Sequence, residues 1–101
     1  MRPERRGGVP PLAEDKVSEL LKQLDGWEVV NNHHLSKEFK FGDFKETQAF
    51  VNRVGEIAEE QWRHPDICYG WGRAVITIWT HKIDGLTESD FILAAKIDQL
   101  Q

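Results

Sequence analysis

Two histidines in this chain, His64 and His81, are placed where side chains can carry out acid–base chemistry. Pro65 holds His64 in a loop directly after a predicted helix, and His81 follows a predicted strand. Loops on rigid supports often carry reactive groups, and an imidazole can donate or accept a proton near neutral pH. The pattern alone favours a simpler interpretation, in which His64 caps the helix carbonyls and His81 is a surface residue.

The remaining two histidines, His33 and His34, lie beside Asn31 and Asn32 in a predicted turn. Adjacent residues of an extended chain point to opposite sides, so we expect both to be solvent-exposed turn residues that cannot readily share one ligand. No pair of potential ligands, Cys68 included, has the tight spacing of a metal site, and we predict no metal. A single cysteine also excludes an intramolecular disulfide and fits a reducing cytoplasm.

The first half of the chain predicts a helix, a hairpin and a second helix. Apolar residues recur at three- and four-residue steps over 12–24, which is typical of one helix face. The alternation over 27–41 predicts two strands joined at Asn31 and Asn32. Asp43, with Glu46 three residues later, predicts the start of a helix that runs to about Glu60.

The second half predicts a loop over 61–66, a hairpin and a last helix. Residues 74–80 alternate as a strand, with 68–71 as the other strand of the hairpin. Thr87 and Asp90 have the spacing of a capping box at the start of a helix that reaches about Leu100. Asp90 therefore has a sufficient structural role, whatever else it does.

These elements predict an α+β fold with the order α-β-β-α-β-β-α, in which helices cover one face of an antiparallel four-stranded sheet. We assign residues 1–11 to a flexible arm and 12–101 to a single domain. Both faces of the 74–80 strand are largely apolar. The uncovered face therefore predicts a homo-oligomer, either a homodimer or a homotetramer.

Composition narrows the class of partner. The net charge of −4 has the wrong sign for binding nucleic acid chiefly through phosphates, so direct nucleic-acid binding is not expected. No stretch approaches the roughly 18 apolar residues of a membrane span, and no apolar signal segment follows the N-terminal arginines. A cytoplasmic protein with a small-molecule ligand is the expectation.

Several candidate residues occur at fixed spacing, in the order Glu59, Arg63, His64, Pro65, Trp71, His81 and Asp90. This spacing resembles that of the pterin-4a-carbinolamine dehydratases. The likeness extends to Gly26-Trp27, to residues 39–41 before the second helix, and to residues 85–91 at the last helix, and it covers nearly all of the chain after Pro10.

The resemblance implies dehydration of 4a-hydroxytetrahydropterin to quinonoid dihydropterin, in tetrahydrobiopterin recycling, with no metal or organic cofactor. It also implies that His64 and His81 are the catalytic pair and that Glu59 is a buried carboxylate that orients or charge-stabilises an imidazole. Which histidine is the acid and which the base stays open. The residues implied to bind substrate are Arg63, Pro65, Trp71, Thr80, Lys82, Ile83 and Asp90.

Arg63 departs from the family pattern, because active members normally carry a second histidine there. A guanidinium stays protonated and cannot shuttle a proton, although it can donate hydrogen bonds to a carbonyl or a leaving hydroxide. Two alternatives to catalysis therefore remain. One is a non-catalytic assembly or regulatory protein, like relatives that assist a homeodomain transcription factor or RuBisCO assembly. The other is a module that binds pterin without turnover.

Overall fold

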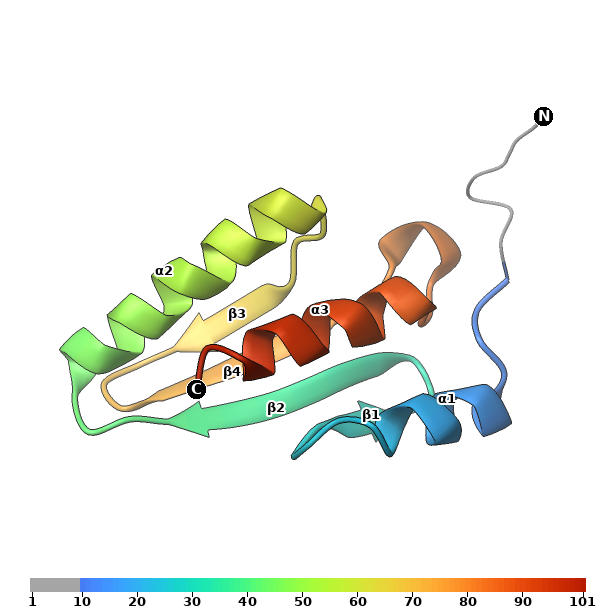
Figure 1. The fold of residues 1–101 in the computed structure, drawn as a ribbon, viewed down its shortest axis with the longest axis horizontal. Helices are drawn as coiled ribbons and strands as arrows, with labels where there is room; N and C mark the ends of the chain where they lie inside the picture. The colour runs from blue at the N-terminus through green and yellow to red at the C-terminus, as the bar shows by residue number, and fades with distance from the viewer. Residues whose placement is uncertain (1–9) are drawn as a thin grey trace.

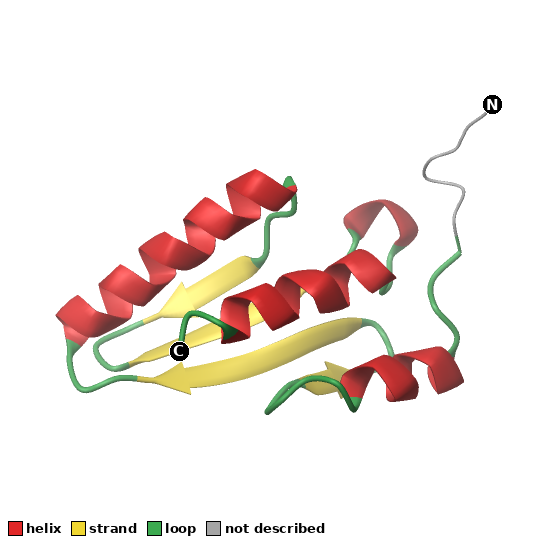
Figure 2. Ribbon diagram, viewed as in Figure 1, coloured by secondary structure: helices red, strands yellow, loops and turns green. Residues whose placement is uncertain are grey.

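The computed structural model describes residues 10–101 of the chain, which form one antiparallel sheet with helices on one face. The strands lie in the order β1-β2-β4-β3 (Figures 1 and 2). This arrangement confirms the predicted α+β fold and the order of its elements. Those elements are α1 (Glu14–Leu21), β1 (Glu28–Val30), β2 (His34–Lys40), α2 (Phe44–Gln61), β3 (Asp66–Tyr69), β4 (Arg73–Ile78), the 3-10 helix η2 (His81–Ile83) and α3 (Glu88–Asp98).

Local chemistry explains where the two longer helices begin. The Asp43 side chain accepts a hydrogen bond from the backbone N–H of Glu46 at 2.8 Å, which satisfies one of the free donors at the start of α2. At α3 the carboxylate of Asp90 accepts from the backbone N–H of Thr87 at 2.9 Å, as in a capping box. Both predicted helix starts are confirmed.

The β1–β2 turn follows from its two asparagines. Asn31 and Asn32 have φ values of 54° and 53°, and the N–H of His33 bonds the carbonyl of Val30 at 2.9 Å. Positive φ at both central residues is typical of the tight turn that matches the twist of a hairpin, and asparagine tolerates it better than most residues. The turn therefore lies where the sequence predicts it.

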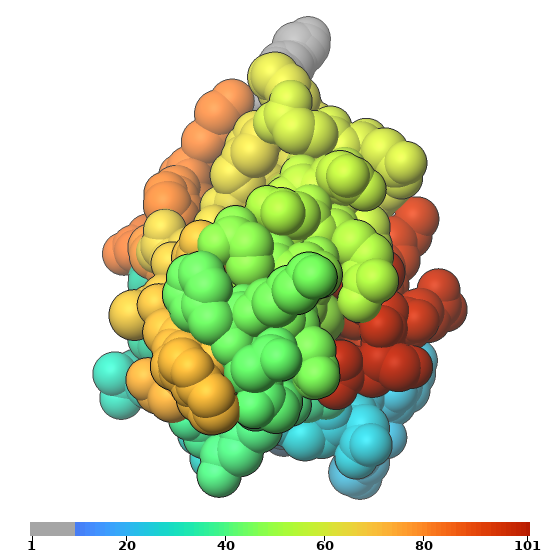
Figure 3. Space-filling view, turned by 90° about the vertical axis from the view of Figure 1, so that its left-hand side faces the viewer, coloured from blue at the N-terminus to red at the C-terminus, as the bar shows by residue number. Residues whose placement is uncertain are grey.

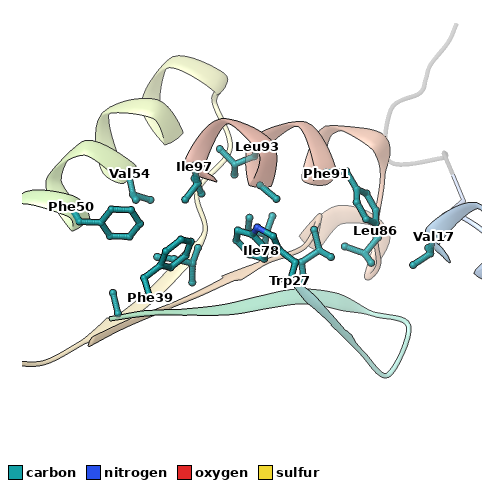
Figure 4. Close-up of a cluster of buried hydrophobic side chains, with 14 residues drawn as sticks. Val17, Trp27, Phe39, Phe50, Val54, Ile78, Leu86, Phe91, Leu93 and Ile97 are labelled. Carbon is teal, nitrogen blue, oxygen red and sulfur yellow. The ribbon is translucent and has the colours of Figure 1, made fainter. Parts of the chain in front are cut away.

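The hydrophobic core lies between the sheet and the helices (Figure 4). Alternate residues of β2 and β4 point into it, and α2 and α3 cover them from above. In Figure 3, α2 (green to yellow-green) faces the viewer, and α3 (red) lies beside it. The largest fully buried side chains of the core include Leu35, Phe50, Ile76, Ile78, Leu86, Leu93 and Ile97.

Several boundaries differ from the sequence prediction. The first helix ends at Leu21 and not at Leu24, and the strand predicted at 68–71 lies at Asp66–Tyr69. The first helix begins at Glu14 because the N–H of Leu12 bonds the carbonyl of Leu86 at 2.9 Å instead of joining the helix. The predicted 74–80 strand ends at Ile78, and Thr80 pairs only with Gly85 in an isolated bridge. His81 consequently lies in η2 and not at a strand terminus.

The predicted arm at 1–11 falls largely outside the described residues, which begin at Pro10. No helix within 10–101 is long and apolar enough to cross a membrane. Burial of the uncovered sheet face against a second copy of the chain stays a prediction.

Candidate functional site

A cavity of about 900 Å³ lies where the end of α2, the end of β4 and the start of α3 meet. In Figure 1 the end of α2 and the turn before α3 are found at the same end of the sheet. The cavity is lined by residues 61–64 and 79–83, together with Thr87 and Ser89. Two segments that are distant in sequence thus bring His64 and His81 to one cavity.

His64 reaches the cavity from the segment that follows α2. Its Nε2 lies 2.6 Å from Oε2 of Glu59, one turn back in the helix. If Nε2 carries the hydrogen and donates to that carboxylate, Nδ1 remains as the ring nitrogen that can exchange a proton. The Glu59 side chain is 68% exposed, so the prediction of a buried carboxylate here is wrong.

His81 lies in η2 and stacks on the indole of Trp79, with ring centroids 4.1 Å apart and an angle of 24° between the planes. Stacking at this distance restricts the orientation of the imidazole. Trp79 also lines the cavity. The sequence analysis missed it as a site residue, although an aromatic residue two positions before a candidate histidine was a usable signal.

His33 and His34 are not the exposed turn residues that the sequence predicts. Both are half-buried, and their Nδ1 atoms are 3.0 Å apart. Their rings lie 5.4 and 5.9 Å from that of Trp79, and His33 Nε2 lies 2.7 Å from Oδ1 of Asp84. The expected alternation fails because His33 belongs to the turn and only His34 to the strand. Within 10–101, no three potential metal ligands gather in one place.

Asp90 is the buried carboxylate of this region, with 1% of the residue exposed. Its Oδ2 accepts from the hydroxyl of Thr80 at 2.8 Å, and Arg63 Nη1 donates to that same hydroxyl at 3.1 Å. Burial raises the pKa of Asp90, while the backbone N–H of Thr87 and the hydroxyl of Thr80 act in the opposite direction. Arg63 and Asp90 are therefore linked through one hydroxyl in the cavity wall.

The structure does not bring every predicted residue to the cavity. Arg63, Thr80, Lys82 and Ile83 line it, as His64 and His81 do, whereas Asp90 lies beneath its wall. Pro65 is not among the lining residues and leads into β3 instead. Trp71 is also not among them, because it lies in the turn between β3 and β4, at the opposite end of β4 from His81.

The arrangement can exchange protons with a small molecule at two positions. Two imidazoles face one cavity, one held by a carboxylate and the other by an indole. A guanidinium adds fixed positive charge and hydrogen-bond donors in the same wall. Paired acid–base groups in an open cavity of this size are typical of a site for a small polar substrate.

The chain is similar to proteins provisionally named as pterin-4-alpha-carbinolamine dehydratases. A Rubrobacter xylanophilus protein provisionally named a pterin-4-alpha-carbinolamine dehydratase is 64% identical over 95 residues, which are 94% of this chain and 89% of that protein. An Alkaliphilus metalliredigens protein with the same provisional name is 50% identical over 95 residues, which are 93% of this chain and 86% of that protein.

Two solved structures share the fold. The transcriptional coactivator/pterin dehydratase from Brucella melitensis matches with a TM-score of 0.85 at 32% identity, over 89% of this chain and 97% of that one. A pterin dehydratase-like protein identified as a RuBisCO assembly factor in the alpha-carboxysome matches with a TM-score of 0.65 at 28% identity, over 75% and 89% of the two chains. Residues 10–100 match the family described as Pterin 4 alpha carbinolamine dehydratase, and the chain belongs to that family.

Proposed function

We propose that this protein is an active dehydratase that converts 4a-hydroxytetrahydropterin to quinonoid dihydropterin, with His64 and His81 as its acid–base pair. The observation that carries the proposal is that both imidazoles line one cavity although His64 and His81 are 17 positions apart in the sequence. Family membership supplies the class of reaction. The placement of the histidines suits that reaction because it requires a proton at one position and the removal of a proton at another.

The chemistry is the loss of water across one bond. The C4a–O bond breaks as the 4a-hydroxyl takes a proton and leaves as water, and the N5–H proton is removed as the N5=C4a double bond forms. One imidazolium supplies the first proton and one neutral imidazole takes the second, so the pair ends with its protonation states exchanged. Each positioned acid or base typically contributes about 10²- to 10⁴-fold.

Glu59 and Trp79 prepare these two histidines for their roles. The carboxylate of Glu59 lies 2.6 Å from His64 Nε2 and fixes which ring nitrogen is free. Trp79 holds the ring of His81 by stacking.

Arg63 replaces one acid–base group of the family pattern with a permanent cation. Its Nη1 is held 3.1 Å from the Thr80 hydroxyl, so the guanidinium keeps a fixed place in the cavity wall. From there its remaining donors can bind the pterin carbonyl or stabilise the departing hydroxyl. In this proposal Arg63 binds and stabilises the substrate, and the two histidines transfer the protons.

The test is a stopped-flow measurement of 4a-hydroxytetrahydropterin decay. We expect the native protein to exceed the buffer rate, and His64→Ala and His81→Ala each to lose about 10²-fold or more of the increase. Arg63→His restores the family residue and serves as a reference for full activity. Decay at the buffer rate in the native protein, with activity only in Arg63→His, would reject the proposal.

The second candidate is a non-catalytic assembly function. Arg63 favours it because the substitution removes a proton-transfer group, and the 28% identical structural relative named as a RuBisCO assembly factor belongs to the same fold. This candidate predicts an intact fold, a native decay rate equal to that in buffer, and a protein partner that co-purifies with the chain.

A further inference from the structure

Trp62 has two properties that are unfavourable for the folded chain by itself. It follows the last residue of α2 with φ 55° and ψ 41°, which is the left-handed conformation. That conformation costs an ordinary L-residue roughly 1–2 kcal/mol, and bulky residues are seldom found in it. Trp62 is also 75% exposed, so its indole gains little from burial.

The backbone at this point needs the left-handed conformation but does not need tryptophan. The N–H of Trp62 bonds the carbonyl of Glu59 at 3.2 Å, and the N–H of Arg63 bonds the carbonyl of Ala58 at 3.0 Å. This pair of hydrogen bonds is the usual way to end a helix, and glycine or asparagine normally occupies the left-handed position. Either residue would end α2 at lower cost, so the indole needs another explanation.

The position of the side chain provides one. Trp62 lines the cavity, and its ring meets that of His64 edge to face, with centroids 5.4 Å apart and an angle of 73°. We propose that Trp62 is a specificity-determining residue whose indole packs against the flat pyrimidinone ring of the pterin beside His64. The proposal deepens the proposed function and rests on it, since it names the surface that selects a planar heterocycle.

The chemistry of an indole suits this role. Aromatic rings bind planar heterocycles through offset stacking or edge-to-face contact, and part of the benefit is lost when the surface is already buried by the protein. An exposed indole beside a proton-transfer group can therefore both hold the ring and exclude water from one side of the imidazole. Backbone strain that persists at a cavity is a recognised mark of functional residues.

Trp71 offers a matched control within the same chain. It is 69% exposed, close to the 75% of Trp62, but it lies at the other end of β4 and does not line the cavity. Its φ is not positive. Replacing either tryptophan with asparagine removes the same side chain, and only the Trp62 variant also relieves the backbone.

The experiment measures the Kd of 7,8-dihydropterin by titration calorimetry for the native protein, Trp62→Asn, Trp62→Phe and Trp71→Asn. We expect Kd to rise about tenfold in Trp62→Asn, which corresponds to about 1.4 kcal/mol. Trp62→Phe keeps a flat ring and should stay within about threefold of native. Trp71→Asn should bind as the native protein does. The urea midpoint of Trp62→Asn should equal or exceed the native midpoint, because asparagine tolerates left-handed φ.

Several results would overturn the inference. These are an unchanged Kd in Trp62→Asn, no binding by the native protein, or a lower urea midpoint that shows a structural role for the indole. A changed subunit number in Trp62→Asn by light scattering would identify Trp62 as a subunit contact instead. Tight binding that depends on Trp62, together with native decay at the buffer rate, would reject the proposed catalysis and leave this inference standing.

Discussion

Asp90 is the residue at which the structure makes its sharpest prediction about stability. Its Oδ2 accepts three hydrogen bonds, from the Thr80 hydroxyl at 2.8 Å, the Thr87 N–H at 2.9 Å and the Thr87 hydroxyl at 3.3 Å. Its Oδ1 is buried and has no partner among the described residues. We consider two replacements, Asp90→Ala, which removes every acceptor, and Asp90→Asn, which keeps a neutral carbonyl oxygen in place.

The two replacements should differ in the free energy of unfolding. Loss of a helix-capping acceptor typically costs about 1 kcal/mol, and each donor left buried without a partner costs about 1–3 kcal/mol. Because Thr80 and Thr87 are only half-buried, water can partly replace the lost acceptor. We therefore expect Asp90→Ala to lose about 2–4 kcal/mol, and Asp90→Asn to lose less than about 1 kcal/mol at pH 7.

The pH dependence separates the charge from the hydrogen bonds. Burial raises the pKa of Asp90 in the folded protein above its ordinary value of 3.8. The folded state therefore binds the proton more tightly than the unfolded state does. The contribution of the protonated Asp90 to stability is therefore present in full below pH 3.8, and it is lost as the pH rises through the raised pKa of the folded state. The side-chain amide of the Asp90→Asn variant cannot titrate, so that variant lacks this loss.

The assay is urea unfolding of the native protein and of Asp90→Asn at closely spaced pH values from 3 to 7. Other titrating groups contribute equally to both proteins, so the difference in unfolding free energy isolates Asp90. We expect the native protein to lose stability relative to Asp90→Asn as the pH rises. A relative gain by the native protein over this range would show that Arg63 and the hydrogen bonds outweigh burial, and would refute the reasoning.

Three further predictions concern other contacts. Gly72→Ala should lower the free energy of unfolding by about 1–3 kcal/mol, because an added Cβ would lie 2.9 Å from the backbone carbonyl oxygen of Phe41. Chemical denaturation measures the change, and Gly70→Ala is the control because a Cβ there meets nothing within 4 Å. Asp98→Ala should cost about 1–3 kcal/mol by the same measurement, since Trp27 Nε1 donates to its carboxylate at 3.0 Å in a partly buried place, and Asp98→Asn should recover much of the loss. Arg63→Lys should raise the KM for the pterin about tenfold with a smaller change in kcat. The reason is that a lysine lacks the planar fork with which Arg63 can bond the Thr80 hydroxyl and the substrate at the same time. A fall in kcat as large as the rise in KM would instead indicate a damaged fold.

The fold was predictable where local chemistry decides it. Asp43 begins a helix because its side chain satisfies a free backbone N–H, and Asn31 and Asn32 form a turn because both accept positive φ. Such features depend on a few neighbouring residues, which a sequence displays directly. The alternation of buried residues in β2 and β4 is read in the same way.

The candidate site was less predictable because strand register and helix termination decide it. β2 and β4 pair so that Leu35 lies opposite Ile78, and this register brings the neighbouring His34 close to Trp79. No local signal announces such a contact between distant segments. The left-handed turn at Trp62 was equally hidden, since the sequence offers no glycine at that helix end.

The most direct test of the central claim is a double-mutant cycle on the two histidines. Single-turnover dehydration of 4a-hydroxytetrahydropterin would be measured for the native protein, His64→Ala, His81→Ala and the double variant. If both imidazoles act on one bound substrate, each single replacement removes most of the rate enhancement and the double variant is little slower than the worse single. A native rate equal to the buffer rate, or losses that simply multiply in the double variant, would contradict a shared site.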